Sequence, residues 1–260
     1  MRLLLAFLLF AFAAPAAAIP EDELDVPYVP TPMRVVERML DMAALTPDDF
    51  LIDLGSGDGR IPIAAAGRGA RALGVDIDPM RIDEAYAAAR FAGVETRARF
   101  RRQDLFATPL RQASVVTMYL LPDINLRLRP RLLTELRPGT RILSHNFTLG
   151  EWRPDAEEEV DASRIYMWIV PAVAGGSWSM RLADGTVLPL ELEQRFQEVT
   201  GTLGGAAIRD AALRGTSIRF TAMTRAGLQT FRGIVGDSAI AADPGAPPDA
   251  VGGWTARRVD

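Results

Sequence analysis

The segment Asp53–Gly59 is the part of this sequence whose residue types and spacing most clearly indicate ligand binding. It reads Asp-Leu-Gly-Ser-Gly-Asp-Gly and stands between an apolar run at residues 50–54 and a helical pattern at residues 61–66. Glycines at such a turn let the backbone bend sharply and approach a ligand that a β-carbon would exclude. The N-terminus of the following helix lies close by and offers backbone N–H groups. We therefore expect a ligand at this loop.

The loop departs from the glycine pattern of dinucleotide-binding proteins. That pattern requires a glycine directly after Gly59, and Arg60 occupies the position. Asp53, two residues before the first glycine, favours a different ligand. The sequence therefore argues against a nicotinamide-dependent oxidoreductase.

Two further acids follow predicted strands. Asp76 ends the apolar run 72–76, about twenty residues after Gly55, and Asp104 follows the alternating segment 97–102. The carboxyl ends of parallel strands border the crevice in which doubly wound sheets bind ligands. Each acid alone has an ordinary alternative as a turn or helix cap, and we expect Asp78 to be such a cap because Pro79 follows it. Combined with the glycine loop, the acids predict a binding site.

Composition argues against several other chemistries. The chain has 260 residues, no cysteine and one histidine, His145. Disulfides and cysteine nucleophiles are therefore excluded, and neither a histidine metal site nor a Ser-His-Asp triad is expected. The net charge of −4 gives no general attraction for nucleic acid. Residues 97–102 form a basic cluster, but its alternation with Ala98 and Phe100 favours a solvated strand face. For His145, a buried position in a strand is favoured over a role as general base.

The elements that position these residues form an alternating pattern of strands and helices between Pro27 and Pro171. We expect strands at residues 50–54, 72–76, 97–104, 115–121, 141–147 and 165–170. A lead-in helix follows Thr31–Pro32, with Thr31 as its N-cap. Further helices are expected from residues 61 and 79 and through residues 132–136, and a third strand-helix unit is expected after residue 97. This order predicts a largely parallel α/β sheet.

After Pro171 glycine turns separate short alternating runs, which predicts an antiparallel sheet or barrel of about five strands. The expected domains are residues 26–171 and 175–260. Residues 1–18 form a separate unit in which Arg2 precedes an apolar run and an Ala-x-Ala-like cleavage site. We expect a signal peptide and an exported or periplasmic chain, with an uncleaved N-terminal membrane anchor as the alternative.

On these residues the chain resembles the class I S-adenosylmethionine-dependent methyltransferases. The resemblance implies a Rossmann-like α/β sheet, here followed by a small C-terminal all-β domain, and S-adenosyl-L-methionine as cofactor. In that class the glycine loop wraps the amino-acid end of the cofactor, and the later acids lie at the ribose hydroxyls and the adenine amino group. The implied cofactor-binding residues are Asp53, Gly55, Ser56, Gly57, Asp58, Gly59, Asp76 and Asp104.

A narrower resemblance rests on three segments: Val26-Pro-Tyr28-Val-Pro30-Thr31-Pro32, Asp53–Arg60 and Tyr119-Leu-Leu-Pro122. Together they resemble the small membrane-linked protein-lysine methyltransferases, which in eukaryotes act on mitochondrial proteins such as the ATP synthase c subunit and the adenine nucleotide translocase. The resemblance covers residues 26–150. It implies a protein acceptor, with membrane-associated proteins among the candidates.

Tyr119 and Pro122 are the candidate acceptor-positioning residues. They stand at the end of the fourth predicted strand, where an aromatic ring and backbone carbonyls would orient an amine and exclude water. A tyrosine that caps the core is the alternative for Tyr119. Tyr28 and Thr31 are candidates for closure over the cofactor, although Thr31 is equally an ordinary N-cap. No metal is expected.

The acceptor is expected to be a protein lysine rather than a nucleobase. The Asp/Asn-Pro-Pro-Tyr/Phe signature of enzymes that methylate nucleobases or glutamine is absent at the fourth strand. A lysine, with an ordinary pKa near ~10.4, must lose a proton before it attacks, which desolvation and the cationic sulfonium favour. The alternative is an exported, non-catalytic module that binds a nucleoside or a partner, because cofactor made in the cytosol would not be supplied to an exported enzyme.

Overall fold

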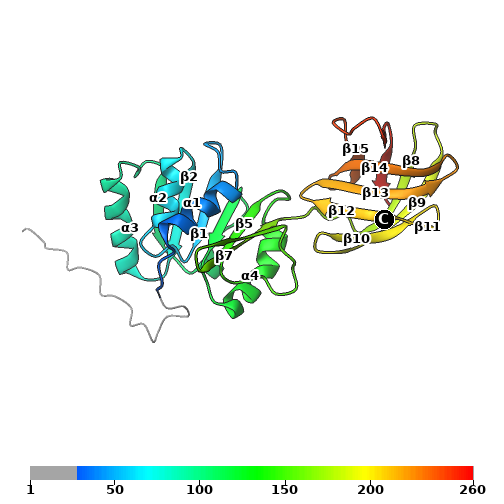
Figure 1. Cartoon of the computed structure of the whole chain (residues 1–260). Helices are drawn as coiled ribbons and strands as arrows, with labels where there is room; N and C mark the ends of the chain where they lie inside the picture. The colour runs from blue at the N-terminus through cyan, green and yellow to red at the C-terminus, as the bar shows by residue number, and fades with distance from the viewer. Residues whose placement is uncertain (1–27, 260) are drawn as a thin grey trace, which may run out of the picture.

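The computed structural model describes residues 28–259, so the predicted signal or anchor at residues 1–18 lies outside the described part of the chain. Within it, the chain forms a seven-stranded sheet with flanking helices and then a ten-stranded sheet (Figure 1). The predicted Rossmann-like α/β fold with a C-terminal all-β region is confirmed. The chain passes from the first sheet to the second between Ile169 and Gly176.

The first sheet has the strand order β3-β2-β1-β4-β5-β7-β6. Its strands are β1 (Phe50–Leu54), β2 (Arg71–Asp76), β3 (Ala98–Arg102), β4 (Val115–Met118), β5 (Arg141–His145), β6 (Ala156–Val160) and β7 (Ser163–Ile169). Strands β1 to β5 pair in parallel, whereas β7 is antiparallel to both β5 and β6. The strand order reverses between β1 and β4, which is where open α/β sheets bind their ligands.

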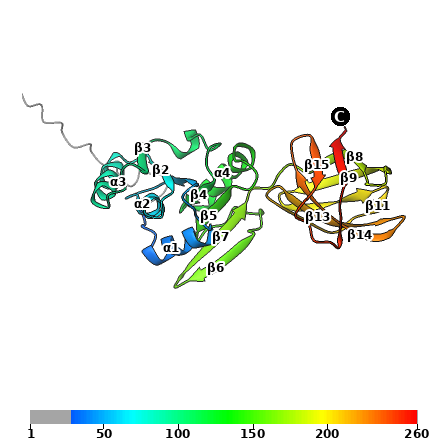
Figure 2. The ribbon, with the colours of Figure 1, turned by 90° about the horizontal axis from the view of Figure 1, so that it is seen from above.

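Four helices cover the two faces of this sheet: α1 (Met33–Met42), α2 (Arg60–Gly67), α3 (Pro79–Phe91) and α4 (Pro122–Glu135). The apolar sides of α1, α2 and α3 pack on one face, and α4 packs on the other, as the view from above shows (Figure 2). Asp78 caps α3 as predicted, because its side chain accepts a hydrogen bond from Met80 N at 2.9 Å. None of the helices in residues 28–259 is long and apolar enough to cross a membrane.

Two local predictions are wrong. Thr31 is not the N-cap of α1, because Pro32 occupies that position and no side chain caps the helix. The third strand-helix unit also lacks an α-helix, since a single 3₁₀ turn, η2 (Leu105–Ala107), follows β3. Residues 103–114 leave too little chain for a helix that spans the sheet.

The alternation in β3 has the predicted consequence. Ala98 and Phe100 are buried against the helices, whereas Arg99, Arg101 and Arg102 are exposed at the edge of the sheet. Charged side chains on an edge strand discourage pairing with other chains. The exposed arginines therefore suit an unpaired edge strand.

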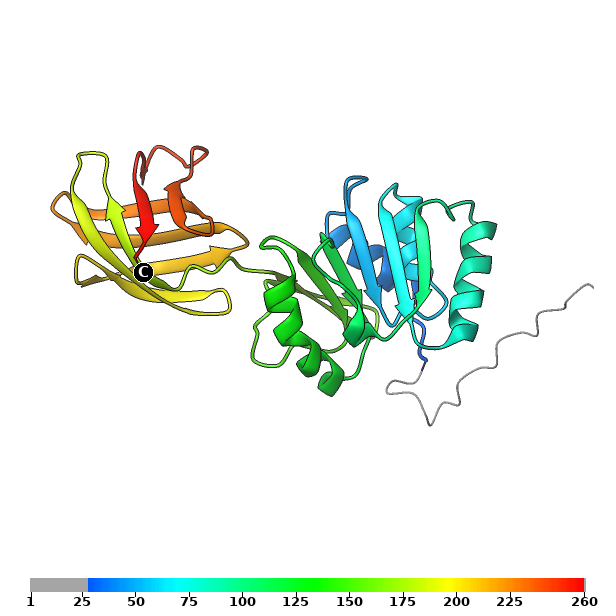
Figure 3. The same cartoon turned by 180° about the vertical axis from the view of Figure 1, so that it is seen from behind.

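The second sheet has the order β11-β10-β9-β8-β17-β15-β14-β13-β12, with β16 beside β14. Its strands are β8 (Gly176–Arg181), β9 (Val187–Arg195), β10 (Glu198–Leu203), β11 (Ala206–Ala207), β12 (Arg209–Arg214), β13 (Ser217–Thr224), β14 (Gly227–Val235), β15 (Ala239–Ala242), β16 (Ala250–Val251) and β17 (Thr255–Arg258). The prediction of about five strands is therefore wrong, although the antiparallel character is right. The sheet curls around a core that contains Trp178, Phe220, Phe231 and Trp254 (Figure 3).

Candidate functional site

The glycine loop between β1 and α2 has a backbone conformation that explains its three glycines. Gly55, Gly57 and Gly59 have φ angles of +76°, +51° and +80°, which side chains disfavour. A β-carbon on Gly57 would lie 2.5 Å from Cε2 of Tyr28, and one on Gly59 would lie 2.6 Å from Cε1 of Phe100. The loop can therefore pass close beneath the Tyr28 ring only as glycine.

A cavity of about 340 Å³ lies above this loop at the carboxyl ends of β1, β2 and β4. Most predicted site residues line it: Tyr28, Thr31, Asp53, Gly55, Ser56, Gly57, Asp58, Asp76, Asp104 and Tyr119. Gly59 and Pro122 do not. Gly59 is the N-cap of α2 and packs against Phe100, while Pro122 is exposed as the first residue of α4. Gly59 and Pro122 therefore lie at the starts of helices beside the cavity and do not line its wall.

Asp53 lies on the floor of the cavity and is 2% exposed. Its Oδ1 accepts a hydrogen bond of 2.7 Å from Thr117 Oγ1. Burial raises the pKa of Asp53 to about 8. A cationic ligand in the cavity would favour the ionised carboxylate, so Asp53 suits a ligand with an ammonium or sulfonium group.

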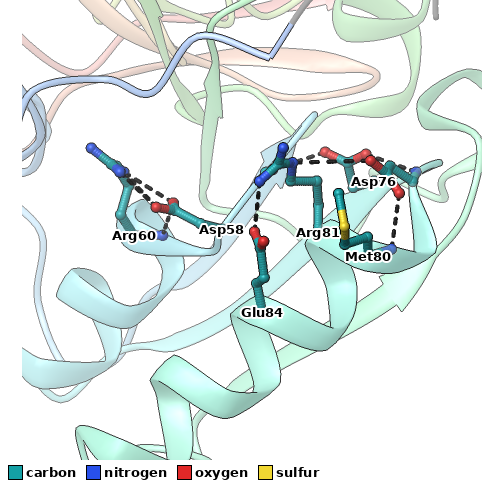
Figure 4. Close-up of polar contacts among 8 residues, drawn as sticks. Asp58, Arg60, Asp76, Met80, Arg81 and Glu84 are labelled. Atoms are coloured by element: carbon teal, nitrogen blue, oxygen red, sulfur yellow. Dashed lines mark hydrogen bonds and ion pairs between the residues drawn. The ribbon is translucent and has the colours of Figure 1, made fainter. Parts of the chain in front are cut away.

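Asp76 links the glycine loop to α3. Its Oδ2 accepts from Gly57 N at 2.8 Å, and its Oδ1 accepts from Asp78 N at 2.9 Å. Burial raises the pKa of Asp76, and the two backbone N–H groups oppose that rise. The fixed carboxylate keeps free lone pairs at the cavity and can accept hydroxyl donors there. Figure 4 shows Asp76 beside the start of α3, which carries Met80, Arg81 and Glu84.

Asp104 has a divided role. It lines the cavity, yet its Oδ1 accepts from Phe106 N at 2.7 Å and caps η2. Gln103, which belongs to no recognisable motif, lines the same part of the wall. The structure therefore places Asp104 at the cavity with a neighbouring amide, and its role at the adenine stays a prediction.

Two arginines hold residues 28–31, the lead-in segment before α1, beside the glycine loop. The sequence analysis gave neither arginine a role. Arg60 pairs with Asp58 at 2.6 Å (Figure 4). It also donates to the backbone oxygen of Thr31 at 2.8 Å. Arg81 stacks on the Tyr28 ring, with 3.9 Å between Cζ and the ring centroid. Arg60 directly follows the glycine loop, and this adjacency was the available signal. Arg81 carries no signal of its own, because only the fold places it beside Tyr28.

Aromatic side chains form a further part of the cavity wall. Tyr119 and Phe147 line it, and their rings stack with centroids 6.1 Å apart. Behind Tyr119 lies His145, with ring centroids 3.9 Å apart. His145 is 2% exposed, and burial lowers its pKa to about 4, so the imidazole is neutral at neutral pH. The predicted buried histidine thus supports the aromatic wall, and Phe147 is a wall residue that sequence reasoning missed.

The residues of this cavity fit S-adenosylmethionine. Ser56 lines the cavity, and its buried Oγ has no hydrogen-bond partner among the described residues, so it can bond a ligand there. Asp76 has acceptor capacity for hydroxyls, and Asp53 suits a cation. With the strand order of the first sheet, these features define an S-adenosylmethionine-dependent methyltransferase of the Rossmann-like class.

Comparisons with known proteins agree with this class. Residues 53–156 match the family described as the ANTKMT methyltransferase domain. A protein-lysine N-methyltransferase of Saccharolobus islandicus (strain REY15A) is 42% identical over 151 residues, which is 56% of this chain and 94% of that protein. The adenine nucleotide translocase lysine N-methyltransferase of Mus musculus is 35% identical over 148 residues, which is 56% of this chain and 64% of that protein.

A solved structure also resembles part of the chain. The RNA methyltransferase from Salinibacter ruber in complex with S-adenosyl-L-homocysteine is 46% identical, with a TM-score of 0.54 over 55% of this chain and 94% of that one. The chain belongs to the ANTKMT methyltransferase family. It is an S-adenosylmethionine-dependent methyltransferase, and the alternative of a non-catalytic binding module is not favoured.

Proposed function

We propose that this enzyme transfers the methyl group of S-adenosylmethionine to a lysine amine of a protein. The protein-lysine N-methyltransferase of Saccharolobus islandicus, aligned over 94% of its own length, supports this acceptor. The observation that carries the proposal is the aromatic wall of Tyr119 and Phe147 at one end of the cofactor cavity. Such a wall can receive a long aliphatic side chain that ends in an amine.

The chain's own residues divide the work. Asp76 and the Gly55–Gly57 loop would hold the cofactor, and Asp53 would face its positive charge. When bound, S-adenosylmethionine would supply a methyl carbon that an uncharged amine attacks while the methyl–sulfur bond breaks and the sulfur leaves as a neutral thioether. Tyr119 and Phe147 would align the amine and exclude water from it.

Proton loss from the acceptor needs no dedicated base in this site. A lysine ammonium has an ordinary pKa near ~10.4, and an apolar environment beside a cation lowers it. His145 is not positioned as the base, because its Nδ1 is paired with Thr31 Oγ1 at 3.1 Å and its buried Nε2 does not reach solvent. Desolvation by the aromatic wall would lower the pKa of the acceptor amine, which would release its proton to solvent before methyl transfer.

The test is transfer of tritiated methyl from S-adenosylmethionine to protein and RNA fractions of the source cells, followed by mass spectrometry of the labelled species. We expect methyl-lysine in one or a few proteins. The test variant is Tyr119→Leu, which removes the aromatic ring and leaves an apolar side chain in its place. This variant should lose methyl transfer and keep cofactor binding. Label confined to RNA or to small molecules would refute the lysine acceptor.

Methylation of RNA is a second candidate because one comparison favours it. The Salinibacter ruber protein named an RNA methyltransferase is 46% identical and covered over 94% of its length. In this chain the exposed arginines of β3 would be the surface for phosphates. Replacing Arg99 and Arg101 by glutamine distinguishes the two candidates, since only RNA methylation should weaken and become less dependent on salt.

We also propose that residues 1–18 direct the enzyme to a membrane, where its acceptor is found. The apolar run after Arg2 supports this targeting, and two relatives of this chain are named for acceptors in the adenine nucleotide translocase and in ATP synthase. Cell fractionation with N-terminal sequencing of the mature chain tests the proposal. A new N-terminus after Ala18 indicates a cleaved signal, and an intact N-terminus in the membrane fraction indicates an anchor. An intact chain in the cytosol would contradict both.

A further inference from the structure

The turn between β9 and β10 leaves the second sheet and packs against the methyltransferase region. Phe196, at this turn, has a φ of +56° and contacts the hydrophobic core of the first sheet. Its ring stacks on Trp152, with centroids 5.9 Å apart and planes at 13°. The guanidinium of Arg129, on α4, lies 5.6 Å from the same ring. Phe196 is therefore a side chain of the second region that is anchored in the first.

Polar contacts flank this anchor on both sides. Arg195 pairs with Glu151 at 2.7 Å, and Gln197 Nε2 donates to Arg153 O at 2.6 Å. The ion pair is 65% and 70% exposed, so it adds little to the free energy of docking. The aromatic contact is the main attachment of this turn.

The segment that receives Phe196 also carries the wall of the cavity. Residues 146–152 run from the end of β5 to Trp152, and Phe147 of this segment lines the cavity. Asn146 has a φ of +61°, and Phe147 N donates to His145 O at 2.8 Å, which makes a tight turn. One end of this segment thus meets Tyr119, and the other end meets Phe196.

Helix α4 joins the two ends. Arg129 Nη1 donates to Leu149 O at 3.0 Å, while its guanidinium contacts Phe196. One turn earlier, Asn125 Nδ2 donates to the backbone oxygens of Phe147 and Thr148 at 3.4 and 3.3 Å. The segment is therefore held by α4 from one side and by the β9–β10 turn from the other.

We propose that the second sheet supports the acceptor site from outside the cavity, with Phe196 as a positioning residue. Through Trp152 and Arg129 it holds residues 146–152 so that Phe147 stays against Tyr119. This role depends on the methyltransferase activity of the chain and is independent of the acceptor's identity. It assigns a function to a region that lies outside the matched family domain, residues 53–156.

The test compares full-length Phe196→Gly with wild type by hydrogen exchange. Glycine accepts the positive φ, so the change removes the ring without backbone strain. We expect amides of residues 146–152 to exchange roughly tenfold faster, because the segment opens locally. The dissociation constant for S-adenosylmethionine, measured by calorimetry, should stay within about twofold, since Asp76 and the glycine loop are untouched.

Two controls make the result specific. Phe196→Tyr keeps the ring, and Leu228→Ala removes an exposed side chain elsewhere in the second sheet, 60% exposed; both should exchange like wild type. Unchanged exchange in residues 146–152 of folded Phe196→Gly would overturn the proposal. Acceleration that is as large in β1 and β2 would also overturn it, because it reports general loss of stability.

Once the acceptor is identified, the KM values for the acceptor and for S-adenosylmethionine give a second test. Phe196→Gly should raise the apparent KM for that acceptor at least severalfold while the KM for S-adenosylmethionine is kept. The exchange experiment needs no acceptor, so it still decides the inference if the lysine assignment fails. An equal increase in the KM for the acceptor and the KM for S-adenosylmethionine would contradict a role confined to the acceptor side.

Discussion

Thr31 and His145 are 114 positions apart in the sequence and meet through a hydrogen bond of 3.1 Å between Thr31 Oγ1 and His145 Nδ1. Both are buried, with exposed fractions of 4% and 2%. Tyr119 covers the imidazole, so the contact ties the lead-in segment to the aromatic end of the cavity. Thr31, which was expected to cap a helix, instead holds residues 28–31 against the cavity through this hydrogen bond.

Thr31→Val should lower the free energy of unfolding by about 1–3 kcal/mol, because it leaves a buried imidazole nitrogen without its partner. Thr31→Ser keeps the hydroxyl and should remain close to wild type. Urea unfolding followed by circular dichroism measures the difference. Equal stability of the two variants would show that the hydrogen bond contributes nothing.

Gly57→Ala should abolish measurable binding of S-adenosylmethionine. Its β-carbon would come within 2.5 Å of Tyr28 Cε2 and displace the ring that covers the loop. Gly93→Ala is a matched control, because Gly93 also has a positive φ, +68°, but has open space around it. If calorimetry shows that both variants bind the cofactor equally well, binding does not depend on the absence of a β-carbon at residue 57.

Asp76→Ala should weaken cofactor binding by roughly 2 to 4 kcal/mol, or about thirtyfold and upward in dissociation constant, because ligand hydroxyls lose their acceptor. The backbone N–H groups of Gly57 and Asp78 also lose theirs. Asp83→Ala removes an exposed carboxylate on α3 and should bind normally. Retained affinity in the Asp76 variant would contradict the assigned cofactor site.

Local sequence signals were sufficient where strands and turns are set by neighbouring residues. The apolar run of β1 ends at the glycine loop, and Asp78–Pro79 begins α3, so the positions of Asp53 and Asp76 at the sheet edge could be predicted. In contrast, β6 reads Ala-Glu-Glu-Glu-Val and has no apolar alternation. It is a strand because it pairs with β7, which a local pattern does not reveal.

Contacts between distant segments set the rest of the site. Arg81 acts on Tyr28, and Phe147 joins the cavity wall, only after α3 and the end of β5 are folded beside it. Phe196 is a further case, since a single aromatic residue at a hairpin turn does not indicate which surface it contacts. Periodicity predicts which face of an element is buried, whereas the partner of that face depends on the complete fold.

The stability of the cofactor-free enzyme should fall as the pH rises from 6.5 to 8. The folded-state pKa of Asp53 is about 8, raised from 3.8 by burial, so the folded chain retains a proton that the unfolded chain releases. Unfolding therefore releases a proton in this range, and the free energy of unfolding drops by up to about 1.4 kcal/mol per pH unit from this group. His145, whose pKa is lowered from 6.5 to about 4, has the opposite effect and acts below this range.

Asp53→Asn removes the titration and keeps an acceptor for Thr117, so its free energy of unfolding should vary less steeply with pH. Urea unfolding of both chains at several pH values measures the two slopes, and parallel slopes would show that Asp53 does not hold the proton.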